Sequence, residues 1–522
     1  MTGRGAFLGE PTTPRRWSSP VARRLPGLAR LLIGLVLCAG STGCAGLFGS
    51  YDIAPNGLAS SDERLRHMLA SDQAAAAFTG FGDRHRAPDD DVLRTLYRGV
   101  IAYYAGEYAE SARMLDIAGP LADDRITKSV SRSALSVVSN DRILPYEPGR
   151  TERLMIPYYG ALARLRMGDV EGAAVEARRL SFLLQLYGAD DDPLEPALHA
   201  TLRYVAGAIF EAHGDWNDSD VAYRNALTID SSLALPPLAR PHDTGTVIVI
   251  LEQGFVAHRV EQGLSVMLLP EEVDLIANGE GDERAGALGF VAARTLRQAA
   301  RQPFVSEGVY RPTTLYVPPP EDPSLIPKRR PRMVCTTVAD SASATANGSP
   351  GSKPRQVCTE EEAKIDELPY LLKVAWPVYR SDYRPLDARL IGSADTIGFS
   401  GRADVSRGIV ADFQAERALI VARTVARAAA KLALTKGAEK KIEEKNEAAG
   451  KIIGLLGNIG NALLERADTR SWHLLPAGIS IARVQLPPGE HQLQVELGAR
   501  IISLDPIMVA AGDMAIVPAR VW

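Results

Sequence analysis

Three segments between residues 91 and 230 repeat one pattern, and this repetition constrains the fold more than any other feature of the sequence. Each segment contains a helix-like stretch, a short turn made of a glycine, an acidic residue and a bulky residue, and a second helix-like stretch. The three turns are Gly106-Glu107-Tyr108, Gly168-Asp169-Val170 and Gly214-Asp215-Trp216. Since units of this kind bury their apolar faces by stacking on one another, the pattern predicts an array of packed helix pairs.

The units resemble the tetratricopeptide repeat (TPR), a helix–turn–helix unit of about 34 residues. Residues at the offsets typical of that repeat are Gly207, Phe210, Gly214, Trp216, Tyr223 and Ala226 in the third unit, Gly99, Gly106, Tyr108, Leu115 and Ala118 in the first, and Ala161, Gly168 and Ala173 in the second. The turn glycines lie 62 and 46 residues apart, so we expect a degenerate, TPR-like array with insertions over residues 61–240. A generic helical bundle is the alternative. We expect the aromatic residues of the units in the core, and a groove that accepts a protein partner.

The apolar pattern changes after residue 240. It predicts strands in 244–262, 371–381, 479–486, 491–497 and 514–521, and helices over 282–302 and 404–434. Pro377 cannot donate a ladder hydrogen bond, which favours an edge or a bulge for its strand.

The predicted fold class is therefore α+β with several domains. An N-terminal TPR-like α-helical array is followed by a mixed, β-rich region over 241–400, with an inserted Pro/Ser/Gly-rich loop over 318–366. A helical segment over 401–466 contains the long helix. Residues 467–522 are expected to form a small C-terminal antiparallel β-sandwich, similar to modules of bacterial envelope proteins.

The N-terminus has the layout of a secretory signal. The first 43 residues hold six Arg and a single Glu, and the apolar run LLIGLVLCAG is followed by small residues. That run is shorter than the roughly 18 to 20 residues that a permanent membrane-spanning helix needs. We expect residues 1–43 to be removed and 44–60 to form a tether.

Cys44 and the small residues before it resemble the lipobox of bacterial lipoproteins. The resemblance implies that Cys44 is acylated and becomes the first residue of the mature chain, whereas Cys38 is lost with the signal. Ser41 departs from the pattern, because leucine is usual there, and cleavage without lipidation is the alternative. Ala45 follows the cysteine in place of an inner-membrane retention signal, which implies an outer-membrane anchor facing the periplasm.

Two further cysteines, Cys335 and Cys358, flank a loop rich in serine, alanine, glycine and proline. Short strand-like pieces joined by such a loop, in an oxidising compartment, predict a hairpin closed by a disulfide. Two free thiols are the alternative. A zinc site is less favoured, because neither a CxxC pattern nor clustered histidine accompanies these cysteines.

The sequence contains no contiguous motif typical of catalysis. The eight His are scattered, and phosphate-binding, dinucleotide-binding and nucleophile-elbow patterns are absent from the sequence. We therefore expect no enzyme activity, no cofactor and no metal. The net charge is -4, and removal of the predicted signal with its six Arg and one Glu leaves 53 basic against 62 acidic residues, or -9, which argues against binding of nucleic acid.

Two groups of residues are candidates for binding. Arg423, Arg427 and Lys431 lie four apart on the long helix and predict a basic edge. A solvated face is the main interpretation, and a site for an acidic partner or an anionic glycan is the alternative. In the segment ADTRSWHLLP, Asp468, Arg470 and Trp472 combine charge and a large ring. There the main interpretation is structural, with an Asp–Arg pair and Trp472 packed beneath it.

The lipobox, the degenerate repeats, the ARTVARAAAK helix and the ADTRSW…LP motif together resemble a family of proteobacterial TPR-containing lipoproteins. Members are encoded near lipoprotein activators of penicillin-binding proteins, which implies work in the cell envelope. The expected function is a non-enzymatic scaffold, anchored to the membrane by its lipid, that binds protein partners in the periplasm through its repeats. A regulator of peptidoglycan synthesis and, less favoured, a glycan hydrolase or transferase are the alternatives. Neither the partner nor the oligomeric state follows from the sequence.

Overall fold

The computed structural model describes residues 53–84, 92–132, 145–189, 194–234, 243–300, 305–306, 314–338, 355–361, 365, 369–392, 396–443 and 467–522. The predicted signal peptide and Cys44 lie outside these residues. The described chain begins with eight helices: α2 (Ser60–Ala70), α3 (Ala74–Arg84), α4 (Val92–Tyr104), α5 (Tyr108–Arg132), α6 (Arg150–Arg166), α7 (Val170–Gly188), α8 (Pro196–His213) and α9 (Trp216–Ile229).

The predicted helix pairs are confirmed as α4–α5, α6–α7 and α8–α9, and successive pairs pack on one another. The three turn glycines, Gly106, Gly168 and Gly214, have φ angles of 81°, 76° and 94°. Side chains rarely tolerate this left-handed conformation, so glycine ends the first helix of each pair. Gly207 lets α9 approach closely, since a Cβ there would lie 3.0 Å from the ring of Tyr223.

Two four-stranded sheets follow the array. The first has the order β10 (Ser400–Asp404), β11 (Pro476–Leu486), β1 (Gly245–Phe255) and β16 (Met514–Val521), and the second has the order β14 (Arg500–Ser503), β13 (Gln494–Leu497), β8 (Ala388–Ile391) and β9 (Thr396–Gly398). A short pair joins β12 (Gly489–His491) to β15 (Ile507–Val509). β11 is antiparallel to β1, whereas β16 is parallel to it. The expected antiparallel direction is therefore wrong for β16, because β16 pairs with a strand distant in sequence rather than with its neighbours.

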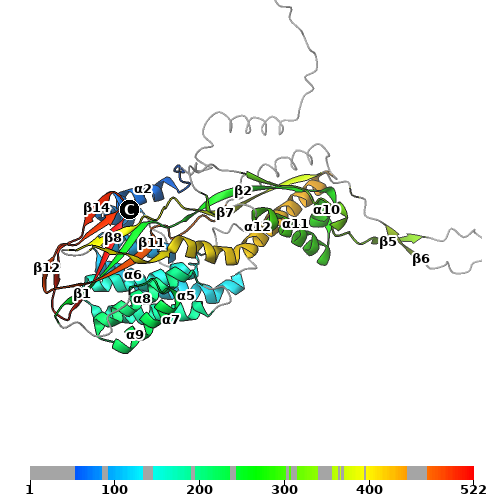
Figure 1. The fold of residues 1–522 in the computed structure, drawn as a ribbon. Helices are drawn as coiled ribbons and strands as arrows, with labels where there is room; N and C mark the ends of the chain where they lie inside the picture. Colours follow the sequence, from blue (N-terminus) through cyan, green and yellow to red (C-terminus); the bar gives the residue numbers. More distant parts are fainter. Residues whose placement is uncertain are drawn as a thin grey trace, which may run out of the picture. The chain divides into compact units, whose positions relative to one another are not determined.

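The central strands of the first sheet, β1 and β11, are buried on both faces. Ile248 and Ile250 of β1 pack in one core with the helical array, while Val249 and Leu251 pack in a second core with the other sheet. Successive side chains of a strand point to opposite faces, so an unbroken apolar run is what a central strand between two layers requires. Figure 1 shows α6, α8 and α9 on the same side of β1 and β11.

A third sheet has its own core. Its order is β3 (Val305–Ser306), β7 (Tyr370–Arg380), β2 (His258–Leu268) and β4 (Thr314–Val317). It packs with α10 (Pro270–Asn278) and α11 (Asp282–Ala300), and Ile326, which follows the short 3-10 turn η3 (Pro323–Leu325), joins the same core. Among the described residues, β3 pairs with Tyr379 and Arg380 of β7 and none pairs with Pro377 on that side of the strand, in agreement with the predicted edge position.

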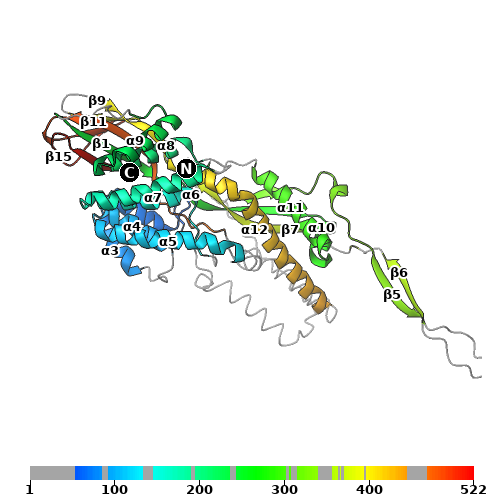
Figure 2. The ribbon, with the colours of Figure 1, turned by 90° about the horizontal axis from the view of Figure 1, so that it is seen from below.

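A single helix, α12 (Val405–Glu443), belongs to two of the cores. Its first turns place Val405, Ile409 and Phe413 in the core of the array, and later turns place Val425 and Leu432 in the core of the third sheet. Figure 2 shows α12 extending from the region of α6 to that of α10 and α11. The helix was predicted over 404–434 and continues nine residues beyond that end.

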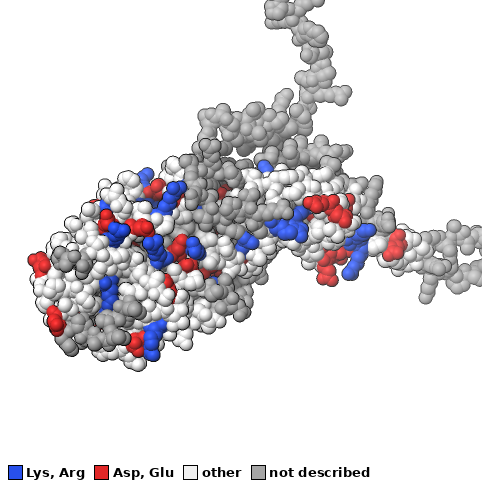
Figure 3. All heavy atoms as spheres, viewed as in Figure 1, with Lys and Arg blue, Asp and Glu red and all other residues white. Residues whose placement is uncertain are grey.

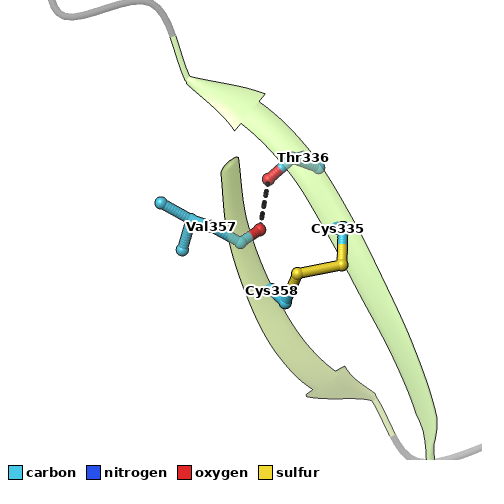
Figure 4. The surroundings of a disulfide bond; sticks show 4 residues. All are labelled: Cys335, Thr336, Val357 and Cys358. Carbon is cyan, nitrogen blue, oxygen red and sulfur yellow. Dashed lines mark hydrogen bonds between the residues drawn. A yellow bond between two sulfur atoms is a disulfide. The ribbon is translucent and has the colours of Figure 1, made fainter. Parts of the chain in front are cut away.

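The remaining strands, β5 (Arg332–Val338) and β6 (Arg355–Glu361), form a two-stranded antiparallel hairpin. Cys335 and Cys358 lie directly opposite each other and are joined by a disulfide (Figure 4), which confirms the predicted pairing. The Thr336 hydroxyl lies 3.5 Å from the carbonyl oxygen of Val357 on the facing strand.

Candidate functional site

The first helices of the repeat pairs are covered by the protein's own sheet. Tyr158 and Tyr159 of α6 donate hydrogen bonds of 2.9 and 3.1 Å to the two carboxylate oxygens of Glu252 on β1. On α8, Glu211 receives two hydrogen bonds, of 2.6 and 2.9 Å, from the guanidinium of Arg483 on β11. The face that these helices present is therefore filled from within the chain.

The second helices leave apolar side chains exposed. Val175, Phe182 and Leu186 of α7 are 55%, 62% and 49% exposed, and their spacing of seven and four residues places them on one face of the helix. We call these three residues the outward stripe. The expectation that the repeat aromatics are all core is confirmed for Tyr223 and wrong for Trp216, which is 43% exposed.

The ADTRSWHLLP segment begins beside the third sheet, where the backbone N–H of Ala467 donates a 2.8 Å hydrogen bond to Glu261 of β2, and it leads into β11. Arg470 donates from Nε and Nη2 to the two carboxylate oxygens of Asp468, at 2.8 Å each. This two-point pair fixes the segment's direction. The structural interpretation of Asp468 and Arg470 therefore agrees with their contacts.

Trp472 lies in the core of the helical array and is fully buried. Its backbone N–H donates a 3.0 Å hydrogen bond to Glu152, which also accepts from the Tyr146 hydroxyl and from the backbone N–H of Gly149. Burial raises the pKa of Glu152, and these donors oppose that shift. Trp472 thus packs beneath the segment, and its ring is inaccessible to a ligand.

The residue after Trp472 belongs to a buried network that the sequence did not indicate. The Nε of Arg66, on α2, donates to Nδ1 of His473 at 3.2 Å, and its Nη2 donates to the carbonyl oxygens of Val256 and His473. A third contact places Nη1 of Arg66 3.3 Å from Nδ1 of His258. Burial lowers the pKa of Arg66 to about 10, so it stays protonated at neutral pH. Burial also lowers the pKa values of both histidines.

A cavity of about 440 Å³ adjoins this network, lined by α2, α3, α4 and the segment that contains His473. We call it the α2–α4 pocket. Its apolar wall includes Leu65, Met68, Phe81 and Leu93. The polar lining includes Arg470, the only one of the sequence-predicted candidates to line this pocket. Because α2 and His473 lie some 400 residues apart in the chain, local sequence patterns could not have brought them together.

The three basic residues of α12 do not form an exposed edge. Arg427 is 2% exposed, and Arg423 and Lys431 are half-buried. The solvated-face interpretation is therefore wrong for Arg427, which is buried although it lies on the other side of α12 from Val425 and Leu432. On the face drawn in Figure 3, basic and acidic side chains of the described residues are interspersed rather than separated by sign.

Three further findings bear on function. The described part of the chain contains no cluster of His, Cys, Asp or Glu able to hold a metal ion. None of its helices is long and apolar enough to cross a membrane. Comparison with protein-family models, with curated proteins and with solved structures finds no match for this chain.

Proposed function

We propose that the protein is a non-enzymatic lipoprotein scaffold, anchored through Cys44 to the outer membrane and facing the periplasm, that binds a protein partner through the outward stripe of its repeats. The observation that carries the proposal is the contrast between the two faces of the array. One face is occupied by the first sheet, with β10, β11 and β16 against α8 and Glu252 of β1 bonded to α6, while Val175, Phe182 and Leu186 remain exposed on α7. Exposed apolar residues gathered on one helix face are typical of protein interaction sites.

The proposed compartment is supported by two features. The Cys335–Cys358 disulfide is of the kind that persists in oxidising environments, of which the periplasm is one. The arginine-rich, apolar N-terminus with Cys44 supplies a route to that compartment. A scaffold also needs a stable framework, and the described chain provides three buried cores. The core of the array shares β1 with the core between the sheets and shares α12 with the core of the third sheet.

Site-specific photo-crosslinking in the native cell tests the partner surface. A photoreactive amino acid would replace Phe182 or, in a matched control, Met508, which is 73% exposed on β15 and distant from the stripe in sequence. We expect a discrete crosslinked product from position 182 that disappears when Val175→Asp is added. Equal crosslinking from both positions, or none from position 182, would contradict the proposed surface.

Membrane fractionation tests the anchor. Cys44→Ser removes the proposed acylation site and should move the protein from the membrane to the soluble fraction, because an acyl chain contributes roughly 0.8 kcal/mol of membrane affinity per buried CH₂. Cys38→Ser is the matched control, since Cys38 is expected to leave with the signal, and this variant should stay membrane-bound. A Cys44→Ser protein that remains in the membrane fraction would exclude lipid anchoring at this residue.

A further inference from the structure

His473 presents a hydrogen-bond donor to the α2–α4 pocket. The guanidinium of Arg66 can only donate, so Nδ1 of His473, 3.2 Å from Arg66 Nε, must be the acceptor and must lack a proton. In the neutral ring the proton therefore sits on Nε2. That atom lies 3.5 Å from Asp62 Oδ2, which is longer than a normal hydrogen bond. His473 is 2% exposed and lines the pocket, so a buried N–H is available there to a better acceptor.

The charge of the lining favours an anion. The charged residues that line the pocket are Arg64, Arg94, Arg470 and the single acid Asp62. The charge of Arg470 is balanced by Asp468. Arg64 is exposed at the rim and has no ion-pair partner in the described part of the chain. An anionic group entering the pocket would thus meet the guanidinium of Arg64 and the Nε2–H of His473.

The apolar part of the lining would suit the apolar portion of a ligand. Leu65, Met68, Phe81 and Leu93 form this part, and they belong to the three helices α2, α3 and α4. Ligand pockets commonly combine such an apolar lining with a few polar groups that fix orientation, in volumes of about 300 to 1,000 Å³. The volume of this pocket, about 440 Å³, falls in that range.

We propose that the α2–α4 pocket binds a small amphipathic anion, in which an apolar chain lies against α2, α3 and α4 and a carboxylate or phosphate head reaches His473 and Arg64. This site is separate from the outward stripe and does not depend on the proposed protein partner. A free fatty acid and an alkyl or acyl phosphate share the required chemistry.

Isothermal titration with short, micelle-free probes tests the proposal. The full chain carrying Cys44→Ser avoids the need for detergent, which would compete for the pocket. The probes are octanoate, octyl phosphate, octyltrimethylammonium and inorganic phosphate. We expect saturable binding of octanoate or octyl phosphate, and the preferred one identifies the head group. Equal binding of the cationic probe, tighter or equal binding of inorganic phosphate, or no binding by either octyl anion would overturn the proposal.

Two neighbouring alanines of α3 provide matched variants. Ala75 and Ala76 are both exposed, but only Ala76 lines the pocket. Ala76→Trp should fill the cavity and weaken binding of the octyl anion by about tenfold or more, while Ala75→Trp should leave it unchanged. Arg64→Gln, at an exposed residue, should weaken it by about two- to fivefold. Binding that is the same in the Ala76→Trp protein and the parent would place the probe elsewhere and overturn the proposed site.

Discussion

Glu252 illustrates how single buried residues hold distant parts of this chain together. It lies on β1, is 2% exposed, and accepts hydrogen bonds from Tyr158 and Tyr159 on α6. The guanidinium of Arg520, on β16, lies 3.8 Å from its carboxylate. Removing a carboxylate from water is costly, and these donors only partly offset that cost. Burial accordingly raises the pKa of Glu252 above its ordinary value of 4.5.

Glu252→Gln should therefore change how stability depends on pH. Between the ordinary pKa of an unfolded Glu and the raised pKa in the fold, the native state keeps a proton that the unfolded state releases. The contribution of Glu252 to stability is thus greatest at low pH and is lost as pH rises through the folded pKa. Urea unfolding should be measured for both proteins between about pH 4 and pH 7. As pH rises, the free energy of unfolding of the parent should decrease relative to that of the Glu252→Gln variant. A difference that stays constant or increases with pH would contradict this assignment.

Arg483 and Glu211 form a second such link, between β11 and α8. The pair is bidentate, and the Tyr223 hydroxyl also donates to Glu211 at 2.6 Å. Their separation of 272 residues in the chain shows that the contact depends on the complete fold. The same is true of Arg66 and His473, and it explains why neither pair had a recognisable sequence signal. In contrast, Asp468 and Arg470 are two residues apart, and their pairing was predictable.

At the scale of single elements, the turns of the repeats follow directly from local sequence. Gly168 ends α6 with a φ angle of 76°, and Asp169 caps α7 by accepting a 2.9 Å hydrogen bond from the N–H of Gly172. Both features are encoded by residues next to each other in the chain, because glycine tolerates the left-handed conformation and Asp is a favourable N-cap. This is why the helix pairs could be located from the sequence although their spacing is irregular.

Two glycine-to-alanine substitutions should have opposite effects on stability. Gly168→Ala forces a Cβ into the left-handed region and should lower the free energy of unfolding by about 1 to 2 kcal/mol. Gly289→Ala, in α11, places a Cβ where no atom lies within 4 Å, and should raise it by about 0.4 to 1 kcal/mol. Chemical denaturation of both variants measures the difference. Equal effects of the two substitutions would show that backbone conformation does not distinguish these sites.

At the scale of the whole molecule, β1 is the element that the layers share. Ile250 and Leu251 are neighbours on this strand, yet Ile250 packs with the helical array and Leu251 packs with the second sheet. Both side chains are fully buried. Because β1 also pairs with β11 and β16, loss of either core should disturb the strand ladder on which the other depends.

Ile250→Ala and Leu251→Ala should therefore destabilise the same cooperative unit. Each substitution removes a fully buried aliphatic side chain and should cost about 2 to 5 kcal/mol. We expect both variants to shift the unfolding signals of helix and strand together in circular dichroism. If Ile250→Ala lowered only the helical transition and Leu251→Ala only the β transition, the helical array and the two packed sheets would unfold independently.

Local patterns in the sequence predicted the fold class and the positions of most helices and strands. Helical periodicity and turn glycines located the three helix pairs, α11 and α12, while alternating or unbroken apolar runs located β1, β7 and β11. Opposed cysteines around a low-complexity loop predicted the Cys335–Cys358 bond. These successes share a physical reason, because each depends on interactions among residues close in the chain.

The pairing of strands, the coverage of helix faces and the burial of single side chains were found in the folded structure and not in the sequence. The tertiary structure placed β16 parallel to β1, covered the first helices of the repeats with the protein's own sheet, and buried Arg427. It also brought Arg66 to His473 beside the α2–α4 pocket. Strand partners and buried polar contacts between distant residues are selected by the packing of the whole chain, so they leave no periodic signal in the sequence.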